Sequence, residues 1–388
     1  MANQISSPRG MRDFLPKEKL RREQILSEIL DVYRSRGFQS IETPAMENLE
    51  RLLSGQGGDN EKLAFQVLKR GEELDRAVDS GDGLADLGLR YDLTVPLTRF
   101  YASNQSQLPR VFKAVQTGPV WRAERPQKGR YRQFNQCDID ILGDSTIDAE
   151  LELLTASLEA LDRIGLTDAN IRINHRGYLN RVMKELSVDD AAGVLITVDK
   201  LDKIEISGVR QELSEKYGDA LADRVTSWLA EEADIPQELA AFKLDNPRIN
   251  FDKTLVRGMG YYTGAVFEIE HPGSGQSIGG GGRYDGMVGL WMGKDVPAVG
   301  ISLGFERVVD LITKQFDSKP SLVLIYEDIH NALNLQKQAI EAGYDARIEK
   351  RVKNIKSLLE SMGEQGYENF ALTEDEQMFT KLDIKPLS

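Results

Sequence analysis

The sequence FKAVQTGPVWRAERPQKGRYRQFNQCDIDILG, residues 112–143, is the stretch around which the chain is organised. A strand-like run over 113–123 is followed by a strongly basic turn over 125–130 and a second strand-like run over 131–142. This pattern predicts two antiparallel strands with a charged tip. Because side chains alternate along a strand, one face of the second run should carry Phe134, Gln136, Asp138 and Asp140.

The hairpin combines arginines with aromatic side chains. Guanidinium groups bind phosphates through paired hydrogen bonds, and an aromatic ring can stack on a base, so the pattern indicates a nucleotide site. A solvated hairpin with ion pairs is the alternative that these residues leave open.

Bulk composition fits a globular protein of two or three domains. The chain has 388 residues, 40% hydrophobic and 29% charged, and a formal net charge of -13. This charge argues against broad, non-specific nucleic-acid binding but permits a local basic patch. Cys137 is the only cysteine, which fits a reducing compartment. No run approaches the ~18 apolar residues of a membrane span, and the first residues lack a signal-peptide core, so we expect a cytoplasmic protein without membrane contact.

A second polar pair lies before the hairpin. Asp92 and Thr94 stand two residues apart ahead of a helical pattern, so they could hold an ammonium group or cap the helix. The glycine- and acid-rich connection over 53–87, with a more ordered piece over 62–69 between its two glycine-rich ends, predicts a mobile loop near the site, or else a plain surface excursion.

The hairpin strongly resembles motif 2 of class II aminoacyl-tRNA synthetases, in the form found in the histidyl-tRNA synthetase family. Arg122, Glu124, the run over 127–134 and Gln136 carry the resemblance. The segment around Asp92 and Thr94 resembles the family block that holds the α-amino group of the amino acid.

The N-terminal region resembles motif 1, which forms the homodimer interface in that family. The run PRGMRDFLP over 8–16 resembles the family's N-terminal signature. A helix of about twenty residues should follow Pro16, then a strand over 38–43 that ends at Pro44. Four residues of that helix form one apolar stripe, which we expect at a dimer interface: Ile25, Ile29, Val32 and Tyr33.

Three further motifs occur in family order. Residues 255–268 and 277–286 resemble the two histidine-specific signatures, the first supplying Arg257 and the second four successive glycines. The family usually has an acidic residue where Gly260 stands. Residues 297–312 resemble motif 3, whose arginine is Arg307 here.

The resemblance implies an α+β fold with an antiparallel sheet flanked by helices. It predicts a catalytic domain over 1–320, with a helical insertion over about 178–245 that contacts the tRNA acceptor arm in the family. Residues 321–388 have a βαβ pattern that ends in a strand-like run over 379–384, and they resemble a shortened anticodon-binding domain.

The implied function is histidine–tRNA ligase, with ATP and Mg²⁺ as cofactors and histidine and tRNA as partners of a homodimer. Carried over residue by residue, the catalytic residues are Arg257 and Arg122. The residues expected to bind ATP are Arg122, Glu124, Arg130, Phe134 and Arg307. Those expected to bind histidine are Asp92, Thr94, Gln136, Asp140, Arg257, Tyr261, Tyr262 and Tyr284.

Two other functions fit the sequence. One is a non-catalytic paralogue such as the regulatory subunit of ATP phosphoribosyltransferase, which the short C-terminal segment favours and the intact arginines and tyrosines oppose. The other is an adenylate-forming enzyme whose acceptor is not tRNA.

Overall fold

The computed structural model describes residues 5–53, 63–126, 129–242, 245–257, 262–316, 318–374 and 378–387. The chain divides into two compact units, one of residues 1–13 and 26–313 and one of residues 14–25 and 314–388.

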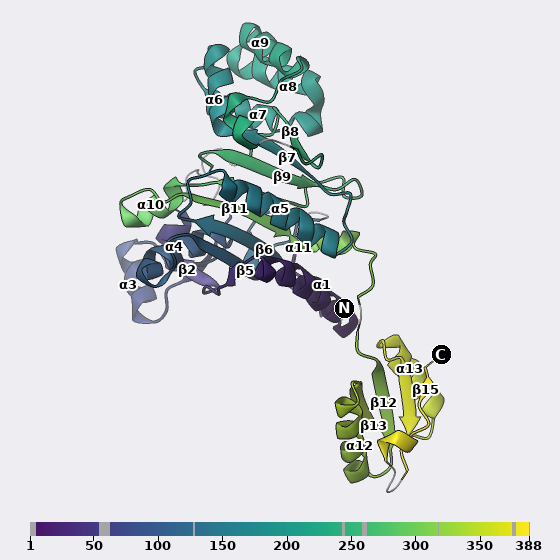
Figure 1. The fold of residues 1–388 in the computed structure, drawn as a ribbon. Coiled ribbons are helices and arrows are strands. Elements are labelled where there is room, and N and C mark those ends of the chain that lie inside the picture. The colour runs from purple at the N-terminus through teal and green to yellow at the C-terminus, as the bar shows by residue number, and fades with distance from the viewer. Residues whose placement is uncertain are drawn as a thin grey trace. The chain divides into compact units, whose positions relative to one another are not determined.

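Residues 5–313 hold a large sheet, a small sheet and their helices (Figure 1). The helices are α1 (Pro16–Ser35), α2 (Leu49–Leu53), α3 (Glu72–Ser80), α4 (Thr94–Asn104), η2 (Gln105–Gln107), α5 (Asp148–Arg163), α6 (Arg176–Glu185), α7 (Ala191–Val198), α8 (Leu201–Tyr217), α9 (Asp219–Ala230), η3 (Gln237–Phe242), α10 (Gly286–Met292) and α11 (Phe305–Leu311). The strands are β1 (Gln39–Ser40), β2 (Met46–Asn48), β3 (Phe65–Leu68), β4 (Ala85–Leu89), β5 (Phe112–Trp121), β6 (Gln133–Leu142), β7 (Asn170–His175), β8 (Ile249–Phe251), β9 (Ala265–Glu270), β10 (Gly279–Arg283) and β11 (Ala298–Gly304).

The large sheet has eight strands in the order β1-β5-β6-β11-β10-β9-β7-β8. Strands β1 and β5, and strands β7 and β8, pair in parallel, and the five pairs between them are antiparallel. The predicted hairpin is β5 and β6, paired continuously from Phe112 opposite Leu142 to Trp121 opposite Gln133. The expected α+β class with an antiparallel sheet is therefore confirmed.

Helix α5 crosses one face of this sheet (Figure 1). Leu154, Leu158 and Leu161 of this helix are at most 4% exposed, whereas Leu151 is partly buried. The helix ends before Gly165, whose φ of 90° lies in the left-handed region that glycine adopts at helix C-termini.

Helices α6 to α9 gather beyond strands β7 and β8 (Figure 1). They enclose a core of their own that includes Leu179, Val194, Val209 and Val225. These four helices therefore form a compact helical group.

The connection before the hairpin is more ordered than expected. Strands β2, β4 and β3 form a three-stranded antiparallel sheet, and α3 joins β3 to β4. Strand β3 lies within the piece over 62–69 that was expected to be more ordered. The mobile-loop prediction is wrong for the rest of 63–87, where α3 and β4 form and pairing with β4 satisfies the backbone of both neighbouring strands. Residues 54–62 of that prediction lie outside the described residues.

The apolar stripe of α1 is not a free face for a partner chain. Ile25, Ile29 and Tyr33 have no exposed surface, and Val32 is 6% exposed. A single chain already covers all four, so our assignment of the stripe to a dimer interface is wrong. Strand β1 is shorter than predicted, is exposed and lies at the edge of the large sheet.

Besides residues 14–25, which include the first part of α1, the second unit holds a four-stranded sheet in the order β13-β12-β14-β15. Its elements are β12 (Ser321–Tyr326), α12 (Ile329–Glu341), β13 (Asp345–Lys350), α13 (Ile355–Glu364), β14 (Asn369–Leu372), η4 (Phe379–Lys381) and β15 (Lys385–Pro386). Leu322 and Leu324 pack with α12 residues, whereas Val323 and Ile325 pack with α13 residues. Alternate side chains of one strand therefore fill two cores. The strand predicted over 379–384 is wrong, since η4 and an extended segment occupy it.

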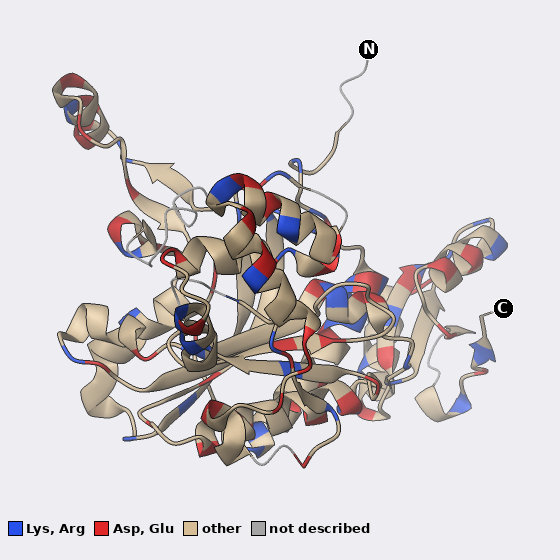
Figure 2. Ribbon diagram, turned by 90° about the horizontal axis from the view of Figure 1, so that it is seen from above, with Lys and Arg blue, Asp and Glu red and all other residues tan. Residues whose placement is uncertain are grey.

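Charges of both signs are interspersed along the helices (Figure 2). This mixing agrees with the expectation that any basic site is local. None of the helices in the described ranges is long and apolar enough to cross a membrane.

Candidate active site

Strand β6 presents three polar side chains to one face of the large sheet. Gln136, Asp138 and Asp140 are 9%, 3% and 3% exposed. The Tyr284 hydroxyl donates to Asp140 Oδ1 at 2.6 Å, and Gln136 Nε2 donates to Ser302 Oγ at 3.0 Å. Among the described residues, Asp138 Oδ1 and Gln136 Oε1 are buried without a hydrogen-bond partner. Buried acceptors without donors are costly, so this face is suited to a ligand that supplies N–H or O–H groups.

Burial dominates the acid–base properties of these carboxyls. It raises the pKa of Asp140 to about 7, with the Tyr284 hydrogen bond opposing the shift and Asp92 adding to it. It also raises the pKa of Asp138 well above its usual range, and nearby Asp140 reinforces that rise. A cationic ligand would relieve this cost because an opposite charge favours the ionised carboxylate.

Asp92 and Thr94 stand at the start of α4. Asp92 Oδ1 accepts from the Val95 backbone N–H at 3.1 Å, as a helix-capping carboxylate does. Burial raises the pKa of Asp92, and Arg122 opposes that shift. Leu93 occupies the N-cap position itself, and the bond from Val95 fixes the Asp92 carboxyl at the start of α4, near the acids of β6.

Four arginines form a positive region on the same body of the chain. Burial lowers the pKa of Arg307, and Arg130, Arg257 and Arg122 lower it further, in that order. Cations this close repel one another unless an anion lies between them. Their grouping is therefore typical of a site for a polyanion such as a triphosphate.

The hairpin tip supports two of these arginines. Arg122 Nε donates to the Tyr91 carbonyl at 3.1 Å, and its guanidinium carbon lies 5.0 Å from the centre of the Phe134 ring. Arg130 Nη1 lies 3.0 Å from Glu124 Oε2. The predicted set Arg122, Glu124, Arg130 and Phe134 is thus brought together.

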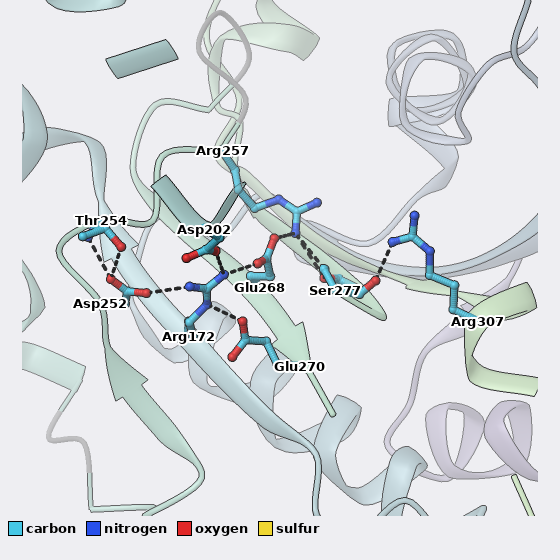
Figure 3. Close-up of polar contacts among 10 residues, drawn as sticks. Arg172, Asp202, Asp252, Thr254, Arg257, Glu268, Glu270, Ser277 and Arg307 are labelled. Carbon is cyan, nitrogen blue, oxygen red and sulfur yellow. Dashed lines mark hydrogen bonds and ion pairs between the residues drawn. The ribbon is translucent and has the colours of Figure 1, made fainter. Parts of the chain in front are cut away.

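Arg257 and Arg307 approach one segment from two sides (Figure 3). Arg257 Nη1 donates to Glu268 Oε2 at 2.8 Å, to the Gly279 carbonyl at 3.1 Å and to Ser277 Oγ at 3.4 Å. Arg307 Nη1 donates to the Ser277 carbonyl at 2.5 Å. The start of β10 therefore orients both guanidinium groups.

Strand β10 is glycine-rich where the side chains of Arg257 and Tyr262 cross it. A Cβ at Gly280 would stand 2.7 Å from Arg257 Cζ, and one at Gly282 would stand 2.8 Å from the Tyr262 ring. On β11, a Cβ at Gly300 would clash with Asp140. These positions exclude side chains by close approach rather than by backbone dihedral angles.

Tyr262 joins the acidic and basic halves of the site. Burial raises the pKa of Tyr262 to about 12; Arg257 opposes the shift, while Asp92, Asp138 and Asp140 add to it. Tyr261, the glycines at 258 and 260, and residues 127–128 of the hairpin turn lie outside the described residues.

Comparison with known proteins fits this geometry. The family model for histidyl-tRNA synthetase matches residues 10–308. A protein described as histidine–tRNA ligase from Leifsonia xyli subsp. xyli is 47% identical over the full length of both chains. The chain belongs to the histidyl-tRNA synthetase family.

Other members of the family extend the match. A histidine–tRNA ligase from Aeropyrum pernix is 40% identical over 78% of this chain and 73% of its own length. The solved histidyl-tRNA synthetase from Nostoc sp. PCC 7120 superposes with a TM-score of 0.77, at 23% identity over 99% of this chain and 97% of that one. A structure from Bacillus halodurans C, described as an ATP phosphoribosyltransferase regulatory subunit/histidyl-tRNA synthetase, gives 0.75 at 22% identity over 96% and 99%. At such identities these two structures show the fold alone.

Membership confirms the function and enzyme class expected from the sequence, histidine–tRNA ligase, and does not favour the regulatory paralogue. Among histidyl-tRNA synthetases ATP is a substrate, so the expectation of a nucleotide site is supported at the level of the family.

Sequence reasoning gave no role to three residues that the structure places at the site. Asp138 lies between Gln136 and Asp140, Glu268 pairs with Arg257, and Glu306 accepts from the Asn135 backbone N–H at 3.1 Å and from Arg12 Nη2 at 2.6 Å. Asp138 and Glu268 could have been found from the sequence, because each is an acidic residue in a strand with many apolar neighbours. Glu306 precedes the motif 3 arginine by one residue, and only its long-range contacts reveal its part.

Proposed function

We propose that this chain activates histidine with ATP and then transfers the histidyl group to the 3′ end of a histidine-specific tRNA. In the first step a histidine carboxylate oxygen attacks the α-phosphorus, and the bond from that phosphorus to the pyrophosphate oxygen breaks. The observation that carries the proposal is the meeting of buried carboxyls and four arginines around one sheet. A ligand pair with a cationic end and a triphosphate end satisfies both.

The acidic half would bind the amino acid. Asp92 and Thr94 would hold the ammonium group, and Gln136 would hold the carboxylate end. Asp140, oriented by Tyr284, would accept from an imidazole N–H, with Tyr262 and Tyr261 beside the ring. A neutral imidazole has one donor and one acceptor nitrogen, so a carboxyl next to tyrosine hydroxyls can satisfy both.

The basic half would bind ATP. Phe134 would stack on the adenine, while Arg122, Glu124, Arg130 and Arg307 would hold the nucleotide. Arg257, with Arg122, would stabilise charge that develops at the α-phosphate, because fixed donors in a partly dry site need no reorganisation during the reaction. The histidine carboxylate is itself the nucleophile, so alignment and electrostatics are what this chain contributes.

Mg²⁺ would be bound together with the nucleotide. The described residues contain no group of three or more His, Cys, Asp or Glu side chains arranged to hold a metal ion. Mg²⁺ commonly uses substrate phosphates and one or two carboxylates, and Glu124 at the hairpin tip fits that donor type. When bound, the ion would neutralise charge on the outer phosphates.

The decisive experiment is histidine-dependent ATP–pyrophosphate exchange, run beside aminoacylation of tRNA. Exchange and charging together support the proposal. Histidine binding without adenylate formation would instead identify a regulatory paralogue. Exchange without tRNA charging would identify an adenylate-forming enzyme with another acceptor.

Assembly, domain boundaries and compartment complete the proposal. We propose a cytoplasmic homodimer with a catalytic domain over 1–320, an insertion over about 178–245 and an anticodon-binding-like domain over 321–388. The motif 1 resemblance supports the dimer, and the exposed edge strand β1 is its remaining candidate contact. Sedimentation at micromolar concentration should give about twice 43.5 kDa, and a monomer would contradict it. Buried, reduced Cys137 suits the cytoplasm, and cell fractionation tests that placement.

A further inference from the structure

Glu268 bridges two arginines that come from different parts of the chain. Its Oε2 accepts from Arg257 Nη1 at 2.8 Å, and its Oε1 accepts from Arg172 Nη2 (Figure 3). The Glu268 side chain is 16% exposed and that of Arg172 is 20% exposed, so both are largely shielded from water. Ionised hydrogen bonds in such a place are stronger and more directional than surface ion pairs.

The sheet register explains why these groups meet. Arg172 on β7 lies directly opposite Glu268 on β9, and Glu268 lies opposite Gly280 on β10. Residues directly opposite one another point to the same face of a sheet. Since Gly280 has no side chain, the Arg257 guanidinium occupies that position in the row and reaches Glu268.

Arg172 is itself fixed by other carboxylates. Its Nη1 donates to Asp252 Oδ2 at 2.8 Å, and its Nε lies 2.8 Å from Glu270 Oε1. Asp252 Oδ1 accepts from the Thr254 backbone N–H and hydroxyl at 2.8 and 2.7 Å. Asp202, on α8, lies 3.5 Å from Arg172 Nη2. Burial disfavours the charge on Arg172, but Glu268, Asp252 and Glu270 outweigh it and raise its pKa.

Arg257 needs such an anchor because it lies among other cations. Arg307 and Arg257 repel each other, and an arginine without an anionic partner can turn toward water. Nitrogen Nη1 donates to Glu268 Oε2, to the Gly279 carbonyl and to Ser277 Oγ. Of these three acceptors Glu268 is the charged one and forms the strongest bond, so it contributes most to setting the plane of the guanidinium. The remaining N–H groups of the guanidinium are then already oriented before the phosphate arrives.

We propose that Glu268, braced by Arg172, is a positioning residue for Arg257 in the activation step. The proposal rests on the proposed function, since it assigns Glu268 to the transition state of that reaction. Arg172 acts through Glu268, and neither residue touches the substrates. Asp202 extends the same network to helix α8.

Glu268→Gln tests the proposal because it keeps the shape and removes the charge. We expect kcat for pyrophosphate exchange to fall by between about 10-fold and about 100-fold, the scale of a small misplacement of a catalytic group. The matched control is Glu270→Gln, which also removes a carboxylate from Arg172 but has no contact with Arg257 among the described residues. It should change kcat less than about 2-fold.

The Kd for ATP distinguishes a positioning role of Glu268 from a purely electrostatic effect of its negative charge. Removing a negative charge beside four arginines would by electrostatics alone tighten ATP binding and leave kcat unchanged. A positioning role predicts a lower kcat without a weaker Kd for ATP. In an Arg257→Ala background, Glu268→Gln should have almost no further effect, because the group it orients is gone. Equal losses in both backgrounds would overturn the proposal.

A crystal structure of Glu268→Gln gives a readout that does not need activity. The proposal expects the Arg257 guanidinium to leave its place over Gly280, and a guanidinium unmoved in the variant would overturn it. A wild-type protein without histidine-dependent exchange would refute the proposed function instead, and the crystal structure would still decide whether Glu268 positions Arg257.

Discussion

Replacing Arg257 by alanine should impair activation much more than it impairs folding. The Arg257–Glu268 pair is partly exposed, at 32% and 16%, so its loss should cost at most about 1 kcal/mol of unfolding free energy. Glu268 retains Arg172 as a partner and is not left as an isolated buried charge. Arg257→Ala should therefore stay folded, with a thermal transition close to that of the wild type.

The catalytic cost should be much larger. Losing one preorganised donor at a developing negative charge typically lowers the rate by about 10² to 10³-fold, or about 2.7–4 kcal/mol. Three arginines remain to hold the triphosphate, and Arg307 is relieved of one repelling neighbour. The KM for ATP should accordingly change less than kcat does. Arg257→Lys should recover only part of the rate, since an ammonium group lacks the planar fork.

Pyrophosphate exchange measured over ranges of histidine and ATP concentration gives kcat and the two KM values separately. A rise in the KM for histidine with kcat unchanged would show that Arg257 only binds the substrate carboxylate. Wild-type exchange by a folded alanine variant would refute the catalytic assignment altogether.

Three further predictions concern a site carboxyl, the glycine-rich strand and a buried ion pair. Asp140→Asn should flatten the pH dependence of the free energy of unfolding. Because the pKa of Asp140 in the folded protein is raised to about 7, this residue stabilises the wild type at low pH. That contribution is lost as the pH rises from about 4 to 7, with a slope of at most about 1.4 kcal/mol per pH unit. Urea unfolding from pH 5 to 8 measures this, and identical slopes in both proteins would contradict it. Gly280→Ala should displace Arg257 and lower kcat for pyrophosphate exchange by at least about 10-fold. The control is Gly286→Ala, whose added Cβ meets nothing within 4 Å and should leave kcat unchanged. Equal kcat values for the two variants would count against the close approach of Arg257 to Gly280. Glu150→Gln breaks a buried ion pair with Arg283, whose two contacts are 2.6 and 2.5 Å and whose side chains are 5% exposed for Glu150 and 10% for Arg283. It should lower the free energy of unfolding, measured with urea, by about 3 kcal/mol. A loss below about 1 kcal/mol would show that Asp285 substitutes for Glu150 as the partner of Arg283.

The hairpin was predictable from sequence because its determinants are local. Alternation sets which residues share a face, and a basic turn separates the two strands, so β5 and β6 follow without knowledge of distant contacts. The same rule placed Gln136, Asp138 and Asp140 together. Their burial, which gives them their chemistry, depends on β11 and on Tyr284, far along the chain.

The errors have a common physical origin. An apolar stripe on α1 shows that something covers that face, but not whether the cover is the same chain or a second copy. Similarly, the many glycines and acids over 53–87 indicated mobility, whereas pairing of β3 and β2 with β4 orders part of that segment. In both cases a tertiary contact decides between two structures that the local sequence allows equally well.

The four successive glycines of β10 allow other parts of the protein to pass close to its backbone. Added Cβ atoms on this strand would meet protein groups, among them the Arg257 side chain at Gly280 and the Tyr262 ring at Gly282. Strand β10 lies between β9, which carries Glu268, and β11, which faces the acids of β6. Because β10 has no Cβ atoms at these positions, Arg257 and Tyr262 can share one surface of the sheet. The glycines are therefore needed to assemble the site before any substrate arrives, which is the condition for catalysis by preorganised charge.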